Sequence, residues 1–138
     1  MKLLREEYEA MIYRIAEFSE HIQYSDLVLI PAGRKLATLT GNIYFASGIR
    51  LEIREALDFD LEEWITGYGY VAYKDDQRQY WYDSQAHPND PSLASTHPHH
   101  KHILPDIKHH RIPAPNISFK SQNLQFLIRE IEKEFFPE

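Results

Sequence analysis

In the segment "IRLEIRE" at residues 49–55, apolar and charged residues alternate from Ile49 to Arg54. Neighbouring side chains of a β-strand point to opposite faces, so this alternation is typical of a strand with one buried face and one solvated face. Ile49, Leu51 and Ile53 are therefore predicted to point inward. A half-buried strand needs strands on its flanks and a layer over its apolar face, which limits the chain to sheet-containing folds.

The segments on both sides of this strand continue the same pattern. "LATLTGNIYFA" alternates before it, and "SG" at 47–48 has the composition of a hairpin turn. "EWITGYGYVAYK" and "QYWYDS" follow it, rich in the aromatic and branched residues that strands favour. We therefore predict a four-stranded antiparallel meander over residues 36–84. Gly67 and Gly69 occupy one face of its third strand and suggest a bulge or a close approach of another group.

Helical periodicity brackets the predicted sheet. Over residues 2–22 and 121–136, apolar residues recur at intervals of three and four, which predicts two amphipathic helices. Residues 85–117, in contrast, hold seven of the eight histidines and six of the eight prolines and show little periodicity. The expected fold class is α+β: an N-terminal helix, a four-stranded antiparallel sheet meander, a long His/Pro-rich loop and a C-terminal helix, in a single domain over residues 1–138.

Composition limits the classes of protein to which the chain can belong. Its 138 residues suit one hydrophobic core. No apolar run approaches the roughly 18–20 residues of a membrane span, and the N-terminus is too charged for a signal peptide, so we expect a cytoplasmic protein. The absence of cysteine excludes disulfides and thiolate metal sites. The net charge of −6 argues against non-specific coating of nucleic acid, although Lys101, Lys108 and Arg111 make residues 97–111 locally basic.

The segment "THPHHKHI" at residues 96–103 allows two kinds of chemistry. His97, His99, His100 and His102 offer the imidazoles that zinc, copper, nickel or iron accept, although their spacing matches no common helix-borne zinc site. In an extended segment, His100 and His102 would face one way and His97 and His99 the other. A carboxylate such as Asp83 could complete a metal site.

Proton transfer is the alternative. Cleavage of RNA by its own 2′-hydroxyl needs a base, an acid and a positive charge near the phosphate. Histidine suits both proton roles because its unperturbed pKa lies near neutrality, and lysine or arginine suits the third role. The proton-transfer candidates are His99, His100 and His102, the phosphate-binding candidates are Lys101 and Arg54, and the orienting candidates are Tyr82 and Asp83.

Substrate-binding candidates surround these residues. Arg78 and Lys108 offer charge, and Tyr70 and His87 offer ring surfaces. Most of the aromatic residues of the predicted sheet are expected to pack in the core or across strands. Because side chains alternate, some must also face outward, where they could stack on bases.

Three motifs, "GIRLEIRE", "GYGYVAYKDDQRQYWYD" and "AHPNDPSLASTHPHHKHI", occur in an order that resembles the TumE-like toxins of toxin–antitoxin systems. The resemblance covers roughly residues 36–103, and Pro98-His99-His100-Lys101-His102 is its most specific part. It implies a toxin that is made beside a cognate antitoxin, which is expected to be a helix-turn-helix DNA-binding protein. The predicted helix and four-stranded sheet are also similar to the scaffold of barnase- and RelE-like RNase toxins, an analogy of fold alone.

The expected function is therefore that of a toxin that acts as a metal-independent endoribonuclease, with RNA as substrate and no cofactor. A metal-dependent nuclease or metal-binding protein is the alternative; it would hold a divalent transition metal such as zinc at His97, His99, His100 and His102. A non-enzymatic interaction module is the third interpretation, and a homodimer is among the expected assemblies.

Overall fold

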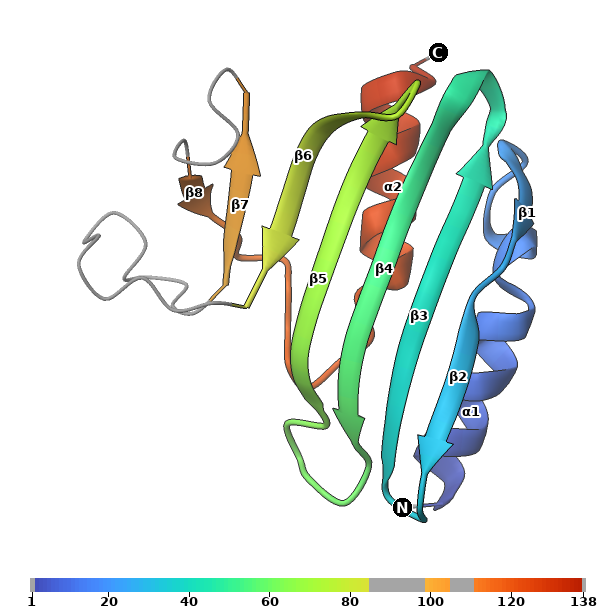
Figure 1. The fold of residues 1–138 in the computed structure, drawn as a ribbon, viewed down its shortest axis with the longest axis vertical. Helices are drawn as coiled ribbons and strands as arrows, with labels where there is room; N and C mark the ends of the chain where they lie inside the picture. Colours follow the sequence, from blue (N-terminus) through green and yellow to red (C-terminus); the bar gives the residue numbers. More distant parts are fainter. Residues whose placement is uncertain (1, 85–98, 105–110, 138) are drawn as a thin grey trace.

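The structure describes residues 2–84, 99–104 and 111–137, with side chains from residue 4 onward. Within these residues the computed structural model contains one eight-stranded antiparallel sheet and two α-helices (Figure 1). In chain order the elements are α1 (Lys2–Tyr13), β1 (Ile22–Ser25), β2 (Val28–Ala32), β3 (Leu36–Phe45), β4 (Ile49–Asp58), β5 (Ile65–Lys74), β6 (Gln77–Asp83), β7 (His100–Ile103), β8 (Arg111–Pro113) and α2 (Leu124–Phe135). Short 3-10 helices lie at Ile15–Phe18 and Ala46–Gly48.

The predicted four-stranded meander is wrong, because the sheet continues beyond it on both sides. Its strand order is β1-β3-β4-β5-β6-β7-β8, and β2 also pairs with β3. β1 and β2 are only four and five residues long, and Pro31 interrupts the second, which an edge strand tolerates. β7 and β8 have the sequences HKHI and RIP, which lack apolar alternation. Their place in the sheet is set by pairing with β6 and with each other, which composition does not reveal.

The N-terminal helix also ends earlier than predicted, at Tyr13 instead of residue 22. Ile15 continues the apolar spacing in a 3-10 turn, and Ile22 already belongs to β1, where it pairs with Phe45. Both isoleucines are buried. The helical spacing therefore identified residues of the core, but their burial follows from tertiary packing in a different backbone conformation.

The core lies between the sheet and the two helices. Ile49, Leu51 and Ile53 of β4 are buried, as the alternation predicts. α2 contributes four fully buried residues, Leu124, Leu127, Ile128 and Ile131. Burial of each such side chain contributes about 1.5–3 kcal/mol. Both helices lie behind the sheet in Figure 1, and the opposite face, which we call the open face, carries no helix of the described residues.

Candidate functional site

The pairing of β6 with β7 brings the most unusual side chains of the chain together. Asp83 lies opposite His100, and Trp81 lies opposite His102. Residues that lie opposite each other in an antiparallel pair share a face of the sheet, and residues two apart in one strand do so as well. These four residues therefore all belong to the open face.

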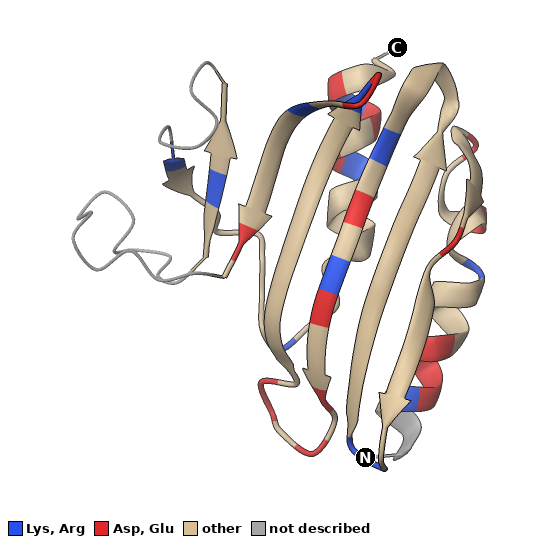
Figure 2. Ribbon diagram, in the orientation of Figure 1, with Lys and Arg blue, Asp and Glu red and all other residues tan. Residues whose placement is uncertain are grey.

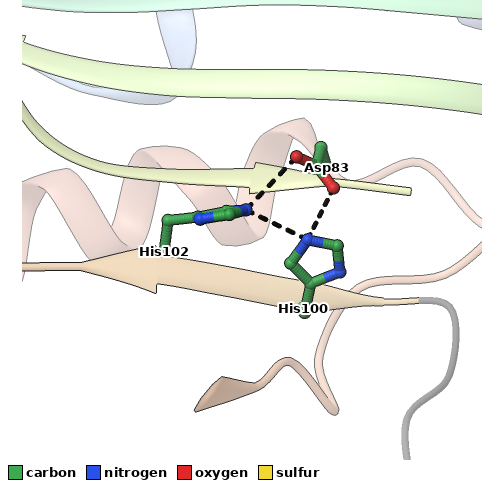
Figure 3. A group of neighbouring side chains, drawn as sticks. All are labelled: Asp83, His100 and His102. Carbon is green, nitrogen blue, oxygen red and sulfur yellow. Dashed lines mark hydrogen bonds and ion pairs between the residues drawn. The ribbon is translucent and has the colours of Figure 1, made fainter. Parts of the chain in front are cut away.

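Asp83, His100 and His102 converge on one point (Figure 3). The Nε2 atom of His100 lies 2.7 Å from Asp83 Oδ1, and that of His102 lies 3.3 Å from Asp83 Oδ2. The two Nε2 atoms are 3.0 Å apart. We call these three residues the Asp83 group.

The Asp83 group is held rigidly. Both imidazoles are buried, with 1% of His100 and 4% of His102 exposed, while the Asp83 side chain is 26% exposed. The indole Nε1 of Trp81 donates to Asp83 Oδ2 at 3.1 Å, and its ring lies 4.3 Å from that of His102. Since two strands carry all four residues, the carboxylate and the imidazoles keep their relative positions.

The number of hydrogens on the Asp83 group restricts its chemistry. Each Nε2 that carries a hydrogen can donate it to Asp83 or to the other imidazole, whereas two Nε2 lone pairs and a carboxylate would repel one another. A proton on one nitrogen relieves this repulsion, and so would one cation bound by both. The group can therefore act as a proton acceptor or as a set of three metal ligands, whose ligand atoms all lie within 4.8 Å of one another.

A hollow in the open face lies beside the Asp83 group. It has a volume of about 340 Å³, and its lining includes Thr40, Arg54, Gly67 and Gly69. Gly69 pairs with Arg54 on one side and with Asp83 on the other. A Cβ at Gly69 would lie 3.4 Å from the Arg54 guanidinium, so the glycine makes room for this side chain to extend over β5 toward the strand that carries Asp83.

Arg54 brings positive charge to this hollow. Among residues 2–84, 99–104 and 111–137, no hydrogen bond or ion pair engages its guanidinium. The Cα atoms of Arg54 and Asp83 are separated by two strand spacings, or roughly 10 Å. Figure 2 shows that basic and acidic positions follow one another along β4.

Lys101 and Tyr82 point to the other face of the sheet, toward α2. The Lys101 ammonium lies 2.8 Å from Glu130 Oε2, and the Tyr82 hydroxyl donates to the same oxygen at 2.7 Å. Lys101 also lies 4.3 Å above the centre of the Tyr80 ring. Burial, then the charge of Glu130, raises the pKa of Tyr82 well above its ordinary value. The structure does not bring these two predicted site residues together with the Asp83 group.

His99 shares that face of the sheet with Lys101. Its Nδ1 lies 2.6 Å from the Tyr68 hydroxyl, and its ring packs against Phe119 at 4.5 Å between ring centres. Burial raises the pKa of Tyr68 above its ordinary range. His99 therefore joins β5 to the segment before α2.

Tyr70 lies in the core, where it belongs to a polar network around Glu55. The hydroxyls of Tyr8 and Tyr70 both donate to the Glu55 carboxylate, and Asn123 Nδ2 donates to the Tyr70 hydroxyl at 3.0 Å. Burial raises the pKa of Glu55 to about 7, and the two tyrosine hydrogen bonds oppose this shift. Tyr70 therefore faces the core, on the other side of the sheet from the Asp83 group.

The remaining predicted residues divide into two groups. Arg78 lies on β6, with its guanidinium carbon 4.7 Å from the Trp81 ring centre. His87, His97 and Lys108 lie outside the described residues.

Sequence reasoning missed Trp81 and Glu130 as partners of the predicted residues. Trp81 stands two positions before Asp83, so strand alternation alone places both on one face. Glu130 lies 29 residues after Lys101, and no sequence signal connects them.

Comparison with known proteins agrees with the order of the motifs. None of the helices in the described part of the chain is long and apolar enough to cross a membrane. No curated protein and no solved structure matches the chain. The model of the toxin TumE family matches residues 12–135, which is most of the chain. The chain therefore belongs to the TumE toxin family.

Proposed function

We propose that this toxin is an endoribonuclease and that the Asp83 group removes a proton from RNA without a bound metal ion. One observation carries the proposal: two buried imidazoles meet a carboxylate on the open face, and the Arg54 guanidinium, which no side chain of the described residues engages, comes from a strand two places away. A proton acceptor and a cation on one face of a sheet are the groups that attack on a phosphodiester requires.

The separation of the imidazoles restricts the mechanism. A phosphorus atom and its two apical oxygens do not fit between nitrogens that are 3.0 Å apart, so His100 and His102 do not serve as base and acid at opposite oxygens. The group acts instead at one oxygen. One imidazole takes the proton of the 2′-hydroxyl, the 2′-oxygen bonds to phosphorus, and the 5′-oxygen leaves with a proton from water. Asp83 stabilises the imidazolium, and the products carry 2′,3′-cyclic phosphate and 5′-hydroxyl ends.

Arg54 stabilises the charge that develops on the phosphate. The hollow over Gly67 and Gly69 lets a phosphate approach the sheet between Arg54 and Asp83. In this account Lys101, Tyr82 and His99 hold β7, α2 and the preceding segment in place.

The test uses purified, untagged protein and a mixed-sequence RNA in buffer that contains EDTA. Wild type is expected to cleave the RNA and leave 2′,3′-cyclic ends. His100→Ala and His102→Ala each lose about 10²–10⁴-fold in rate, the usual contribution of a general base. His21→Ala is the control, because His21 lies in the segment before β1 and stacks on Phe136.

Each variant must unfold at the wild-type denaturant midpoint for its rate to count. Cleavage by His100→Ala and His102→Ala at the wild-type rate would remove the Asp83 group from the mechanism. Cleavage that stops in EDTA would remove the metal-free version.

A metal-dependent nuclease is the second candidate, because Asp83, His100 and His102 offer three ligand atoms of the types that zinc accepts. The bond from Trp81 to Asp83 is the kind of outer contact that fixes a metal ligand. Stoichiometric metal in untagged protein, lost in Asp83→Ala, would favour this candidate. Metal-free protein that is fully active would contradict it.

As a toxin of this family, the chain has a cognate antitoxin as partner. We further expect this antitoxin to be a helix-turn-helix protein. Co-purification and sequencing of the bound partner would test that expectation.

A further inference from the structure

A row of aromatic and guanidinium side chains crosses the open face near the turns that join β3 to β4 and β5 to β6. The pairing register is continuous: Tyr24 lies opposite Tyr44, Tyr44 opposite Arg50, and Arg50 opposite Tyr73. Tyr73 in turn lies opposite Arg78, at a bulge that turns Arg78 to the same face. The row therefore spans five strands, from β1 to β6.

Two pairs of side chains in this row lie in contact. Tyr24 and Tyr44 are stacked, with ring centres 4.4 Å apart and planes 16° from parallel. The Arg50 guanidinium carbon lies 3.8 Å over the centre of the Tyr73 ring. Tyr24 is 56% exposed, so a planar group can add to the free side of this stack.

Beyond Arg78 the row turns toward the Asp83 group. Arg78 lies over the Trp81 ring, and Trp81 contacts the ring of His102. An extended ligand that lay along these side chains would reach the Asp83 group after passing Trp81. We call the six residues the stacking row: Tyr24, Tyr44, Arg50, Tyr73, Arg78 and Trp81.

We propose that the stacking row binds single-stranded RNA by base stacking and leads the strand to the Asp83 group. This inference rests on the proposed function. Aromatic and guanidinium planes accept any base, and a sheet face that carries them is a common platform for single strands. A row of stacking side chains selects unpaired RNA as the substrate, because the bases of a duplex are already stacked on one another.

The charges around the row determine how it binds. Arg50 contacts Asp76 at 3.3 Å and Asn42 at 2.9 Å, and the Asp26 carboxylate accepts from the Tyr44 hydroxyl. The positive charge of Arg50 is therefore compensated by a neighbouring carboxylate. Stacking, rather than phosphate contact, supplies the affinity. If Arg50, Arg54 and Arg78 all reach phosphates, the salt slope of log K is about −2.

The experiment measures binding of a fluorescent 12-nucleotide 2′-deoxy strand to the full chain. The probe lacks the attacking hydroxyl, so binding is measured without cleavage. Tyr44→Ala and Tyr73→Ala are each expected to weaken binding about tenfold or more, in line with the loss of one stacked base. Tyr44→Phe and Tyr73→Phe keep the ring and retain wild-type affinity.

Tyr24→Ala and Tyr13→Ala form a matched pair. Both tyrosines are 56% exposed, but Tyr13 lies on α1, on the other side of the sheet. Only Tyr24→Ala is expected to weaken binding.

The outcomes separate this inference from the proposed function. If probe binding depends on the row but RNA is not cleaved, the result supports RNA binding by the stacking row and contradicts the proposed endoribonuclease activity. Cleavage and probe binding that are both unchanged in Tyr44→Ala and Tyr73→Ala overturn the row and leave the nuclease intact. Unchanged probe binding together with lost neutralisation by the antitoxin also overturns it, because the row would then contact protein.

Discussion

At Glu55 the fold holds a carboxyl group that is 2% exposed and accepts hydrogen bonds from Tyr8 and Tyr70. Its pKa is raised from 4.5 to about 7 because burial disfavours the charged form. The folded protein therefore binds one more proton than the unfolded chain between these pH values. Linkage then requires that Glu55 stabilises the fold fully below about pH 4.5 and loses this contribution as the pH rises through about 7.

Glu55→Gln is expected to remove this pH dependence, since the amide does not ionise. In urea titrations, the free energy of unfolding of wild type relative to Glu55→Gln should fall by about 3 kcal/mol between pH 4.5 and 8, from the size of the pKa shift. Histidine titration is common to both proteins and cancels in the difference. A difference that is constant with pH would show that Glu55 has an ordinary pKa.

Asp83 is argued to stabilise an imidazolium, so its charge should affect the rate of cleavage more than the binding of RNA. Asp83→Asn keeps the shape of the side chain and is expected to lower kcat on the order of 10²-fold. The affinity for the 2′-deoxy probe should stay unchanged. An equal loss in probe affinity would instead indicate that Asp83 supports the binding surface.

At the scale of elements, the Lys101–Glu130 pair joins β7 to α2. Both side chains are 18% exposed, so solvent screens the pair less than a surface pair. Lys101→Met and Glu130→Gln, alone and combined, form a double-mutant cycle in urea unfolding. We expect a coupling energy of about 1 kcal/mol, within the range for residues in contact. Zero coupling would mean that this ion pair does not help to hold β7 against α2.

Gly41 allows the two short strands β1 and β2 to pair with the same strand, β3. It has a φ of 139°, and a Cβ there would lie 2.8 Å from Leu27 Cα, where the chain passes between β1 and β2. Gly41→Ala should therefore destabilise the fold by more than the roughly 1 kcal/mol typical of a strained φ alone.

Gly33→Ala is the matched control for Gly41→Ala. Its φ is 82°, but no atom lies within 4 Å of the added Cβ, so it carries backbone strain without a steric clash. Thermal or urea unfolding compares the two variants. Equal losses would refute the close approach at Gly41.

Hydrophobic periodicity predicts the strands and helices whose own apolar residues form the core. It does not predict a strand whose place depends on side chains of a neighbouring strand. The alternation in residues 49–55 is enough to place Ile49, Leu51 and Ile53 inward. β7 is not predicted as a strand because its alternating residues are histidines instead of apolar residues. Both imidazoles are buried against the Asp83 carboxylate of the neighbouring strand. The same two-residue period nevertheless predicts correctly that His100 and His102 share one side of the segment and that His99 takes the other.

At the scale of the whole molecule, the sheet separates two tasks. The face toward α1 and α2 holds the apolar core, Glu55 and the ion pair of Lys101. The open face holds Arg54, the hollow over Gly67 and Gly69, and the Asp83 group. This division explains why neighbouring residues of "HHKH" contribute to different faces, one to packing against α2 and the other to the proposed chemistry.

The most direct test of the proposed chemistry is end-mapping of total RNA from cells induced to make wild type or His100→Ala. The account predicts growth arrest and new 2′,3′-cyclic ends with wild type. It predicts neither with His100→Ala made to the same level. Growth arrest with intact RNA in wild-type cells would contradict the ribonuclease account while leaving the chain a toxin.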